Sequence, residues 1–556
     1  MSSPLSRSGS DHTTDLSAAG LNSAGKAAVS PWAPLRERSF LLIWSAAVVS
    51  NIGTWMHDVA AAWLMTSLAP APLMVALIQA ATTLPVFLFA LPAGALADLI
   101  DRRRLLLALQ VTAAALAVLL AVIVASDLVS PGLLLLFTFL LGTMTAMGAP
   151  AWQAITPDLV PRPLLTQAVA LNGVGINIAR AIGPALGGLI ITVLGLAWPF
   201  AFNAVSFLAV ILALWLWRQQ PKPASALPAE RLAGAIRSGL RYARGSAPLR
   251  ATLVRSASFF LFASAFWSLL PLVVRGSLAG GPALYGTLLA SVVMGAVAAA
   301  LVLPRLKARL GADGMVTAGT GLLAAGMALL ALVPVVAVAL PACLLAGLAW
   351  ISVMSSLNVS AQLALPAWVR SRGLAVSLAV FFGSMTAGSI VWGFLAGLIG
   401  TPGALLLAAA GALAGILASR PWHLLGDCTL DLSPSGHWPA PVVDEAVVVA
   451  DRGPVLITVE YEIDPPDAAA FAVAIDALSH ARRREGAFFW QVFTDAENPR
   501  RRVEAFMLES WLAHLRQHER VTVEDRHVQE QVRALHRGGS PPRVTHLVAG
   551  QPQVAT

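Results

Sequence analysis

Two charged side chains fall in the middle of long apolar stretches of this sequence. Asp58 follows His57 in "SNIGTWMHDVAAAWLM", and Arg180 lies in "NIARAIGPALGG". A charged residue at the centre of a bilayer costs about 2.5 to 3.5 kcal/mol on insertion scales, so a retained one is a candidate for function. A carboxylate that has lost its water, such as Asp58, takes up a proton more readily and can carry it. Arg180 could bind an anionic molecule or pair with an acid.

Structural roles remain open for both groups. Asp58 could face water in an outer vestibule, and Arg180 could belong to a structural ion pair. Uncharged polar side chains at the same depth are further candidates, because they could line a cavity or could only hydrogen-bond between helices. They are Asn51, Gln79, Gln153, Asn172, Asn203 and Asn358.

A dense group of charges separates two apolar runs in "GALADLIDRRRLLLAL" (94–109). Asp98 is expected near the end of one helix, where it could pair with a cation or a helix N-terminus and hold one side of the molecule closed. Alternatively, the arginines only fix the orientation of the chain in a membrane. The candidate gating residues are Gly94, Leu96, Asp98, Asp101, Arg102, Arg103 and Arg104.

The composition places most of the chain in a membrane. Hydrophobic residues make up 57% of the sequence and charged residues only 12%, with a mean hydropathy of +0.73. Soluble chains carry about 25% charged residues. The two cysteines, Cys343 and Cys428, provide neither a disulfide framework nor a metal-binding spacing. We predict no cofactor and no nucleic-acid partner.

Apolar runs of spanning length predict an all-α membrane protein with twelve transmembrane helices in two six-helix halves. Every second connecting segment between these runs carries at least one Lys or Arg residue. The other connecting segments carry none, apart from Arg275. This asymmetry predicts that both termini are cytoplasmic. We expect the halves to tilt past each other around one central pocket. The runs are 39–66, 72–97, 104–125, 132–154, 165–193, 197–217, 251–274, 283–303, 314–333, 336–359, 373–398 and 402–419.

Beyond residue 421 the pattern becomes that of a small soluble α+β domain. Strands are expected at 454–463, 487–495, 501–510 and 544–550, and helices at 464–486 and 511–535. This β-α-β-β-α-β order is that of a ferredoxin-like unit. The whole chain then divides into a disordered cytoplasmic N-terminal tail (1–35), an N-terminal half (36–217), a basic cytoplasmic central loop (218–250), a C-terminal half (251–420), a linker (421–452) and this domain (453–550).

Three histidines of the small domain raise the question of a metal. His514 and His518 are four residues apart and share a helix face, as zinc ligands can. No third ligand has a clear spacing. We therefore favour solvated or partner-facing roles for these two and for His527, and we predict no metal site.

The charged loop resembles the signature of the major facilitator superfamily, although Leu99 and Asp101 depart from it. The segment "GPALGG" resembles an element of the exporters of that family, in which a proline kinks the helix and glycines let helices approach closely and seal the halves. Together with "SNIGTWMHDVAAAWLM", these motifs resemble the transmembrane secretion effectors, a branch close to the enterobactin exporter. The matching positions are Gly94, Leu96, Asp98, Arg102, Arg103, Gly183, Pro184, Gly187 and Gly188.

The resemblance implies a secondary active transporter of the cell inner membrane. It would export a small siderophore-like or drug-like molecule by proton antiport with alternating access. The segment "ESWLAHLRQHERVTVEDRHV" (509–528) resembles the antibiotic biosynthesis monooxygenase domain of the dimeric α/β-barrel class, which implies a homodimer paired through its sheets. The alternatives are uptake, a membrane-anchored cofactor-independent oxygenase, or a substrate sensor that acts through this domain.

Overall fold

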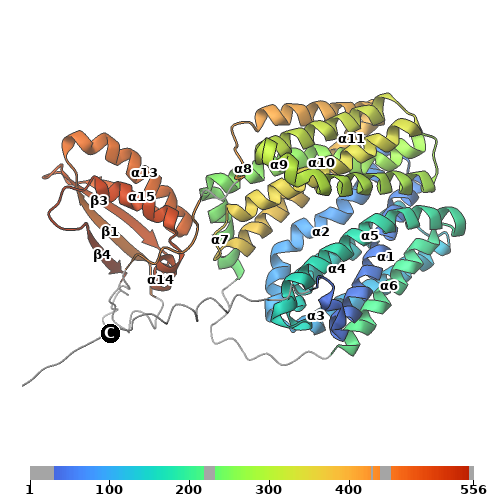
Figure 1. The fold of residues 1–556 in the computed structure, drawn as a ribbon, viewed down its shortest axis with the longest axis horizontal. Coiled ribbons are helices and arrows are strands. Elements are labelled where there is room, and N and C mark those ends of the chain that lie inside the picture. The colour runs from blue at the N-terminus through green and yellow to red at the C-terminus, as the bar shows by residue number, and fades with distance from the viewer. Residues whose placement is uncertain (1–29, 218–231, 427–429, 439–451, 550–556) are drawn as a thin grey trace, which may run out of the picture.

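The computed structural model describes residues 30–217, 232–426, 430–438 and 452–549. The predicted tail (1–35) lies mostly outside the described residues, as do parts of the predicted central loop (218–250) and linker (421–452). The described chain forms a large helical part with a small α+β part beside it (Figure 1).

Six apolar helices make up the first half, each close to its predicted range. Local signals explain their ends: Pro72 and Pro131 occupy first helical turns, where a missing N–H costs nothing, and the side chains of Asp101 and Ser130 accept backbone N–H groups as caps. The helices are α1 (Arg38–Leu68), α2 (Pro72–Leu99), α3 (Arg102–Ala125), α4 (Pro131–Leu159), α5 (Leu165–Leu194) and α6 (Ala197–Leu216). Short 3-10 turns, η1 (Ala33–Arg36) and η2 (Arg162–Leu164), precede α1 and α5.

The second half differs from the prediction in its count of continuous helices. Among the described residues ten helices, not twelve, are long and apolar enough to cross a membrane, and two of them are 51 and 49 residues long. At about 1.5 Å per residue, each exceeds twice the bilayer core of about 30 Å. Both contain a glycine with non-helical backbone, Gly311 (φ 66°) and Gly400 (φ 76°), where two predicted helices meet. The helices are α8 (Ala247–Leu272), α9 (Pro282–Leu332), α10 (Val336–Leu363) and α11 (Arg370–Ala418), with a π-helical turn η3 (Val273–Ser277) after α8.

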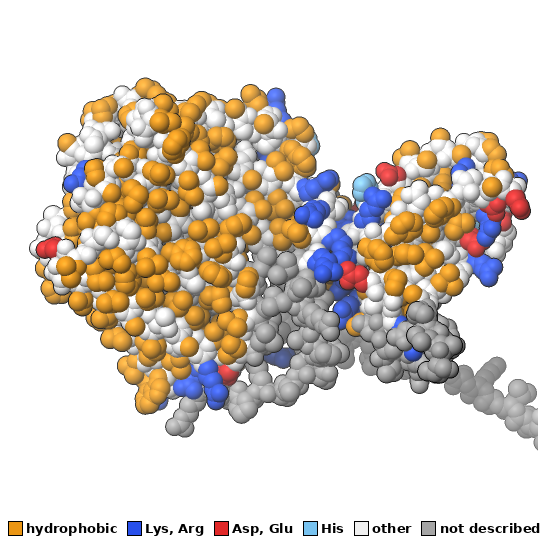
Figure 2. Space-filling model, turned by 180° about the vertical axis from the view of Figure 1, so that it is seen from behind, with side chains coloured by type: hydrophobic (Ala, Val, Ile, Leu, Met, Phe, Trp, Pro, Cys, Tyr) orange, Lys and Arg blue, Asp and Glu red, His pale blue; other side chains and the backbone are white. Residues whose placement is uncertain are grey.

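The surface of the large part is apolar. Figure 2 shows hydrophobic side chains over most of its visible face, and Lys and Arg gathered where it approaches the small part. Large side chains such as Leu301 and Val193 are 74% and 69% exposed. A surface of this kind is stable in lipid and not in water, so the large part is a membrane domain.

The small domain has the predicted β-α-β-β-α-β order. Its sheet has the strand order β2-β3-β1-β4 with antiparallel neighbours. The predicted helix 511–535 is broken into two, because Thr522 caps a new helix and forms a capping box with Asp525. The elements are β1 (Val455–Glu462), η4 (Pro465–Asp467), α13 (Ala468–Glu485), β2 (Phe489–Thr494), β3 (Arg501–Leu508), α14 (Trp511–Arg520), α15 (Val523–Ala534) and β4 (Arg543–Val548).

A helix within the predicted central loop holds this domain against the membrane part. This helix, α7 (Leu232–Gly245), places Arg237 and Arg241 beside Glu509, with N···O distances of 3.1 and 3.6 Å. At the other end of α14, the guanidinium of Arg520 lies 4.5 Å from the ring centre of Trp368, just before α11. Exposed ion pairs contribute little energy each, but together these contacts fix both ends of α14.

Candidate transport site

A cavity of about 710 Å³ lies inside the N-terminal half. Its walls come from α1, α3, α4, α5 and α6, so it is not the expected pocket between the two halves. Most of the wall is apolar, with a few polar groups that could orient a bound molecule. The predicted residues Asn51, Asn172 and Gln153 belong to the wall, together with Thr54, Gln110, Thr145, Thr156, Trp44 and Trp152.

Helices α1 and α5 lie side by side and run in the same direction. The indole N–H of Trp44 donates to the carbonyl of Leu171 at 2.9 Å, and further along a Cβ on Gly183 would lie 2.5 Å from the Cβ of Trp55. A Cβ on Gly187 would likewise lie 3.1 Å from the Cα of Met56. Glycine at these positions lets the two helices touch, so residues on their facing sides occupy common levels.

Asp58 and Arg180 lie on these two helices at different levels. The contacts of Met56 with Gly187 and of Arg180 with Trp55 place Asp58 further along the helices than Arg180. Asp58 follows the last cavity residue of α1, Thr54, by four positions, and Arg180 follows the last cavity residue of α5, Ile176, by four. Four residues complete about one helical turn, so both charges lie on the cavity side of their helices, one turn beyond its wall. The sequence could not show these positions relative to each other, since they depend on the register between α1 and α5.

Neither charge has an ionic partner among the described residues. Asp58 is half-buried, makes no hydrogen bond or ion pair there, and lies within electrostatic range of Tyr285 of α9. Arg180 is also half-buried; its guanidinium stands 5.6 Å from the ring centre of Trp55, and its buried Nε has no hydrogen-bond partner. A structural ion pair for Arg180, one of the two alternatives, therefore does not occur in the described part of the chain.

The remaining polar candidates are spread through the molecule. His57 is buried, its ring meets Phe200 edge-on at 5.1 Å, and neither ring nitrogen has a partner among the described residues. Asn203 is buried against Gly53 between α6 and α1. Gln79 is half-buried in α2, and Asn358 is exposed in α10, where it accepts a hydrogen bond from Gln362. None of these four lines the cavity.

The charged loop between α2 and α3 is tied to its own half. Arg102 donates to the carbonyl of Ala154 at 3.3 Å, and Arg103 donates to those of Leu214 and Trp215 at 2.8 Å. Cations favour the carbonyl end of a helix, so Arg103 stabilises the end of α6. Asp101 accepts the backbone N–H of Arg104, and a Cβ on Gly94 would touch nothing within 4 Å. Leu96 is half-buried in α2, and the side chain of Asp98 lies outside the described residues.

The two halves meet near the breaks 69–71, 126–130 and 195–196, which carry no Lys or Arg and are here called the bare end. A Cβ on Gly188 would lie 2.5 Å from the carbonyl oxygen of Pro282 in α9. The halves also touch near the middle of α2 and of the first part of α11, where the hydroxyls of Thr83 and Thr386 are 2.8 Å apart. Arg275 donates to Thr66 at 2.8 Å. Pro184, one turn before Gly188, lies inside α5 without ending it.

Sequence reasoning missed several of these residues. Gln110 is a polar residue in an apolar run, the same signal that singled out Asn51, and could have been found by it. Arg255 is buried and pairs with Asp313 at 3.3 Å, but these residues are 58 positions apart in sequence, and no local pattern links them.

Two groups of apolar helices in contact, with a mostly apolar cavity that carries a few polar groups, define a transporter of the major facilitator type. Solved structures agree on the fold. A bacterial homolog of the human lysosomal transporter Spinster, inward-facing and unoccupied, aligns with a TM-score of 0.54 over 70% of this chain and 98% of that one, at 16% identity. An auto-inhibited POT family peptide transporter aligns with a TM-score of 0.56 over 69% of this chain and 96% of that one, also at 16% identity.

The chain belongs to the transmembrane secretion effector family, whose model matches residues 29–553. Among curated relatives, the Staphyloferrin A transporter of Staphylococcus aureus is 27% identical over 49% of this chain and 68% of its own length. The enterobactin exporter EntS of Salmonella choleraesuis is 29% identical over 49% of this chain and 64% of its own length. The multidrug efflux pump Tap of Mycolicibacterium fortuitum is 31% identical over 36% of this chain and 51% of its own length. The last two alignments cover less than two thirds of the relative.

Proposed function

We propose that this chain exports a small siderophore-like or drug-like molecule by proton antiport. The observation that carries the proposal is the position of Asp58 and Arg180, one turn beyond the cavity wall and without ionic partners in the described chain. A carboxylate in this setting can gain and lose a proton, and a guanidinium beside an indole can hold an anionic or aromatic molecule. The names of the relatives, two siderophore transporters and a drug efflux pump, support the class of cargo.

The helices form twelve spans with both termini in the cytoplasm of a bacterial inner membrane. Breaks at Gly311 and Gly400 divide α9 and α11 into pairs of ordinary spanning length, which supports the even number. With that count, the basic breaks and α7 face the cytoplasm and the bare end faces outward. The C-terminal domain then lies on the cytoplasmic side.

Transport proceeds by alternating access between two halves. The contacts at the bare end between Gly188 and Pro282 and between Arg275 and Thr66 support a state closed to the outside. In the opposite state, Asp98 at the end of α2 takes part in closing the cytoplasmic side. The comparisons favour transport over the oxygenase alternative, because the curated relatives named above are transporters.

Export and its coupling are tested by accumulation in cells. Enterobactin, staphyloferrin A and fluorescent drug-like compounds are loaded into cells with and without the protein. We expect lower accumulation of at least one compound in the cells that make the protein, and an uncoupler should remove the difference. Higher accumulation would mean uptake, and a difference that survives the uncoupler would rule out proton coupling.

The C-terminal domain pairs two copies of the chain through its open sheet face. Alternate residues of β1 point away from the helices, and the register places Leu456 between Met507 and Leu547, with Phe489 next to Met507. Phe489 and Leu547 are 39% and 52% exposed, and Figure 2 shows hydrophobic side chains gathered on the small part. An exposed apolar sheet face of this kind is typical of an interface.

Replacing an apolar residue of this sheet face by an acid should separate the dimer. We expect the full-length chain in detergent to have the mass of a dimer by light scattering, and Phe489→Glu to have that of a monomer. Val473→Glu is the matched control, since Val473 is 75% exposed on α13, away from the sheet face. A monomeric wild-type chain, or a Phe489→Glu variant that remains dimeric, would contradict this interface.

A further inference from the structure

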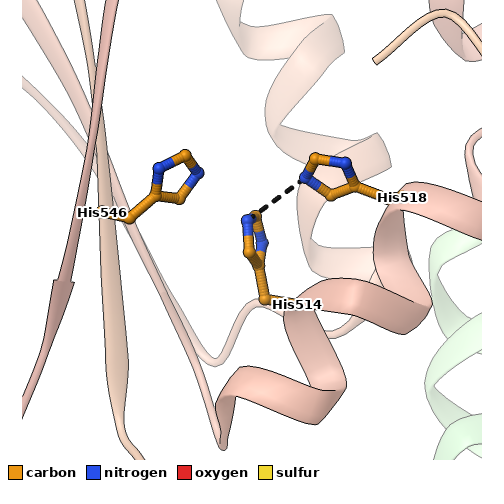
Figure 3. Close-up of side chains that lie close together, drawn as sticks. All are labelled: His514, His518 and His546. Carbon is orange, nitrogen blue, oxygen red and sulfur yellow. Dashed lines mark hydrogen bonds between the residues drawn. The ribbon is translucent and has the colours of Figure 1, made fainter. Parts of the chain in front are cut away.

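Three histidines of the C-terminal domain converge on one point. His514 and His518 lie on α14, and His546 lies on β4, the strand that pairs with β1 (Figure 3). The Nε2 atoms of His514 and His518 are 3.2 Å apart, and one ring nitrogen from each of the three lies within 4.8 Å of the others. The third histidine of the cluster, His546, was not singled out from the sequence, whereas His527 is exposed on α15 and lies outside the cluster.

The environment keeps these imidazoles uncharged. Burial, with smaller contributions from His518 and His546, lowers the pKa of His514 to about 3, and burial lowers the pKa of His518 to about 4. Burial also lowers the pKa of His546. The feature that points to a metal site is the proximity of the three ring nitrogens, one from each histidine, within 4.8 Å of one another. The expected solvated role does not hold for His514, which is only 2% exposed.

Packing alone does not account for the arrangement. The rings of His514 and His518 meet edge-on, so two nitrogen atoms face each other where carbon atoms would be cheaper to bury. The two Nε2 atoms are within hydrogen-bond distance of each other, whereas Nδ1 of both rings is buried and has no hydrogen-bond partner among the described residues. Buried polar atoms without partners are rare in native proteins and mark places where an ion or a water molecule can bind.

We propose that His514, His518 and His546 bind one divalent transition-metal ion, with Zn²⁺ as the best match. In tetrahedral zinc sites the Zn–N distance of about 2.0 to 2.1 Å places neighbouring nitrogens about 3.3 Å apart, close to the 3.2 Å found here. Three neutral imidazoles without a carboxylate suit Zn²⁺, Cu²⁺, Ni²⁺ or Co²⁺, and do not suit Mg²⁺ or Ca²⁺, which require oxygen ligands. Three protein ligands leave the fourth position open.

The surrounding charges permit a cation. The buried guanidinium of Arg482 lies within electrostatic range of His518, and Glu504, buried beside it with an N···O distance of 3.1 Å, balances its charge. Trp438 of the linker lies edge-on against His518 at 4.7 Å and shields that side from water. The site therefore has fixed ligands, a compensated charge and an apolar wall.

Metal binding is measured on the full-length chain in detergent, after removal of its affinity tag and treatment with a chelator. Co²⁺ is the probe, because tetrahedral ligation by nitrogen gives strong visible absorption. We expect one Co²⁺ per chain, displaced by one equivalent of Zn²⁺. His546→Ala and His518→Ala should each weaken binding by at least about 100-fold, since even partners outside the ligand set contribute 10- to 100-fold.

His527→Ala is the matched control and should bind Co²⁺ as the wild type does, because its ring lies outside the cluster. The absence of saturable Co²⁺ absorption in the wild-type chain would overturn the proposal. Equal binding by wild type and His546→Ala would overturn it too. Should both variants fail to fold, the wild-type spectrum and stoichiometry still decide. None of these measurements depends on transport, so a failure here leaves the export proposal untouched.

Discussion

Cells that make the Asp58→Asn variant should fail to lower the accumulation of the cargo, although the variant should be present in the membrane at the normal level. An amide cannot exchange a proton, so export loses its driving force of about 2.3 kcal/mol per 100 mV, which corresponds to a concentration ratio of about 50-fold. Arg180→Ala should lose efflux as well, because it removes the unpaired cation beside Trp55. Efflux is measured in energised cells, and the protein level by immunoblotting of membranes.

Asp127→Asn is the matched control, since it makes the same chemical change on an exposed turn between α3 and α4. Its efflux should equal that of the wild type. Replacements of Arg180 and of Asp58 should also differ in how much activity they retain. Arg180→Lys keeps a charge and should retain part of the efflux activity, whereas no uncharged replacement of Asp58 should support uncoupler-sensitive efflux. Wild-type efflux in Asp58→Asn would remove this carboxylate from the mechanism.

Gly188→Ala should slow efflux by about ten- to a hundredfold. Its Cβ would lie 2.5 Å from the carbonyl oxygen of Pro282 and 3.1 Å from the Cα of Gly286, and backbone atoms cannot move aside as a side chain can. Overpacking of this kind costs about 1 to 3 kcal/mol. This free energy destabilises only the conformation in which the bare end is closed. The variant should therefore spend most of its time open at the bare end, and transport should be slower.

Gly321→Ala provides the comparison for this change. Gly321 lies in α9, the helix that carries Gly286, and a Cβ there would meet nothing within 4 Å. Initial rates of efflux, corrected for protein level, should separate the two alanine variants. If Gly188→Ala transports as fast as Gly321→Ala, closure at this contact is not part of the cycle.

The sequence predicts best where the environment constrains every residue in the same way. Lipid requires about 20 apolar residues per span, so the helices of the first half could be located by composition alone. The domain order from β1 to β4 was equally predictable, because strand alternation and helix periodicity differ along the chain. Gly311 and Gly400 mark the limit of this approach. At each of these positions the two predicted helices are separated only by a non-helical glycine, and composition does not reveal that the break is so short.

Sites proved harder to predict, because they depend on contacts between distant segments. His514 and His518 were recognised together since one helical turn separates them, but His546 joins them only because β4 pairs with β1. Asp58 and Arg180 are each recognised by charge, whereas their positions relative to each other depend on the packing of α1 against α5. The cavity is enclosed by five helices of one half, and no local pattern reports that enclosure.

In the proposed orientation the bare end faces outward, so the chemistry of its contacts determines how the external medium affects transport. Glycine backbones and Arg275 on neutral hydroxyls join the halves there, with no acid opposite a base among these contacts. Dissolved salt screens attraction between opposite charges and has little effect on such neutral contacts. The turnover rate should therefore be nearly the same in fresh and in saline surroundings.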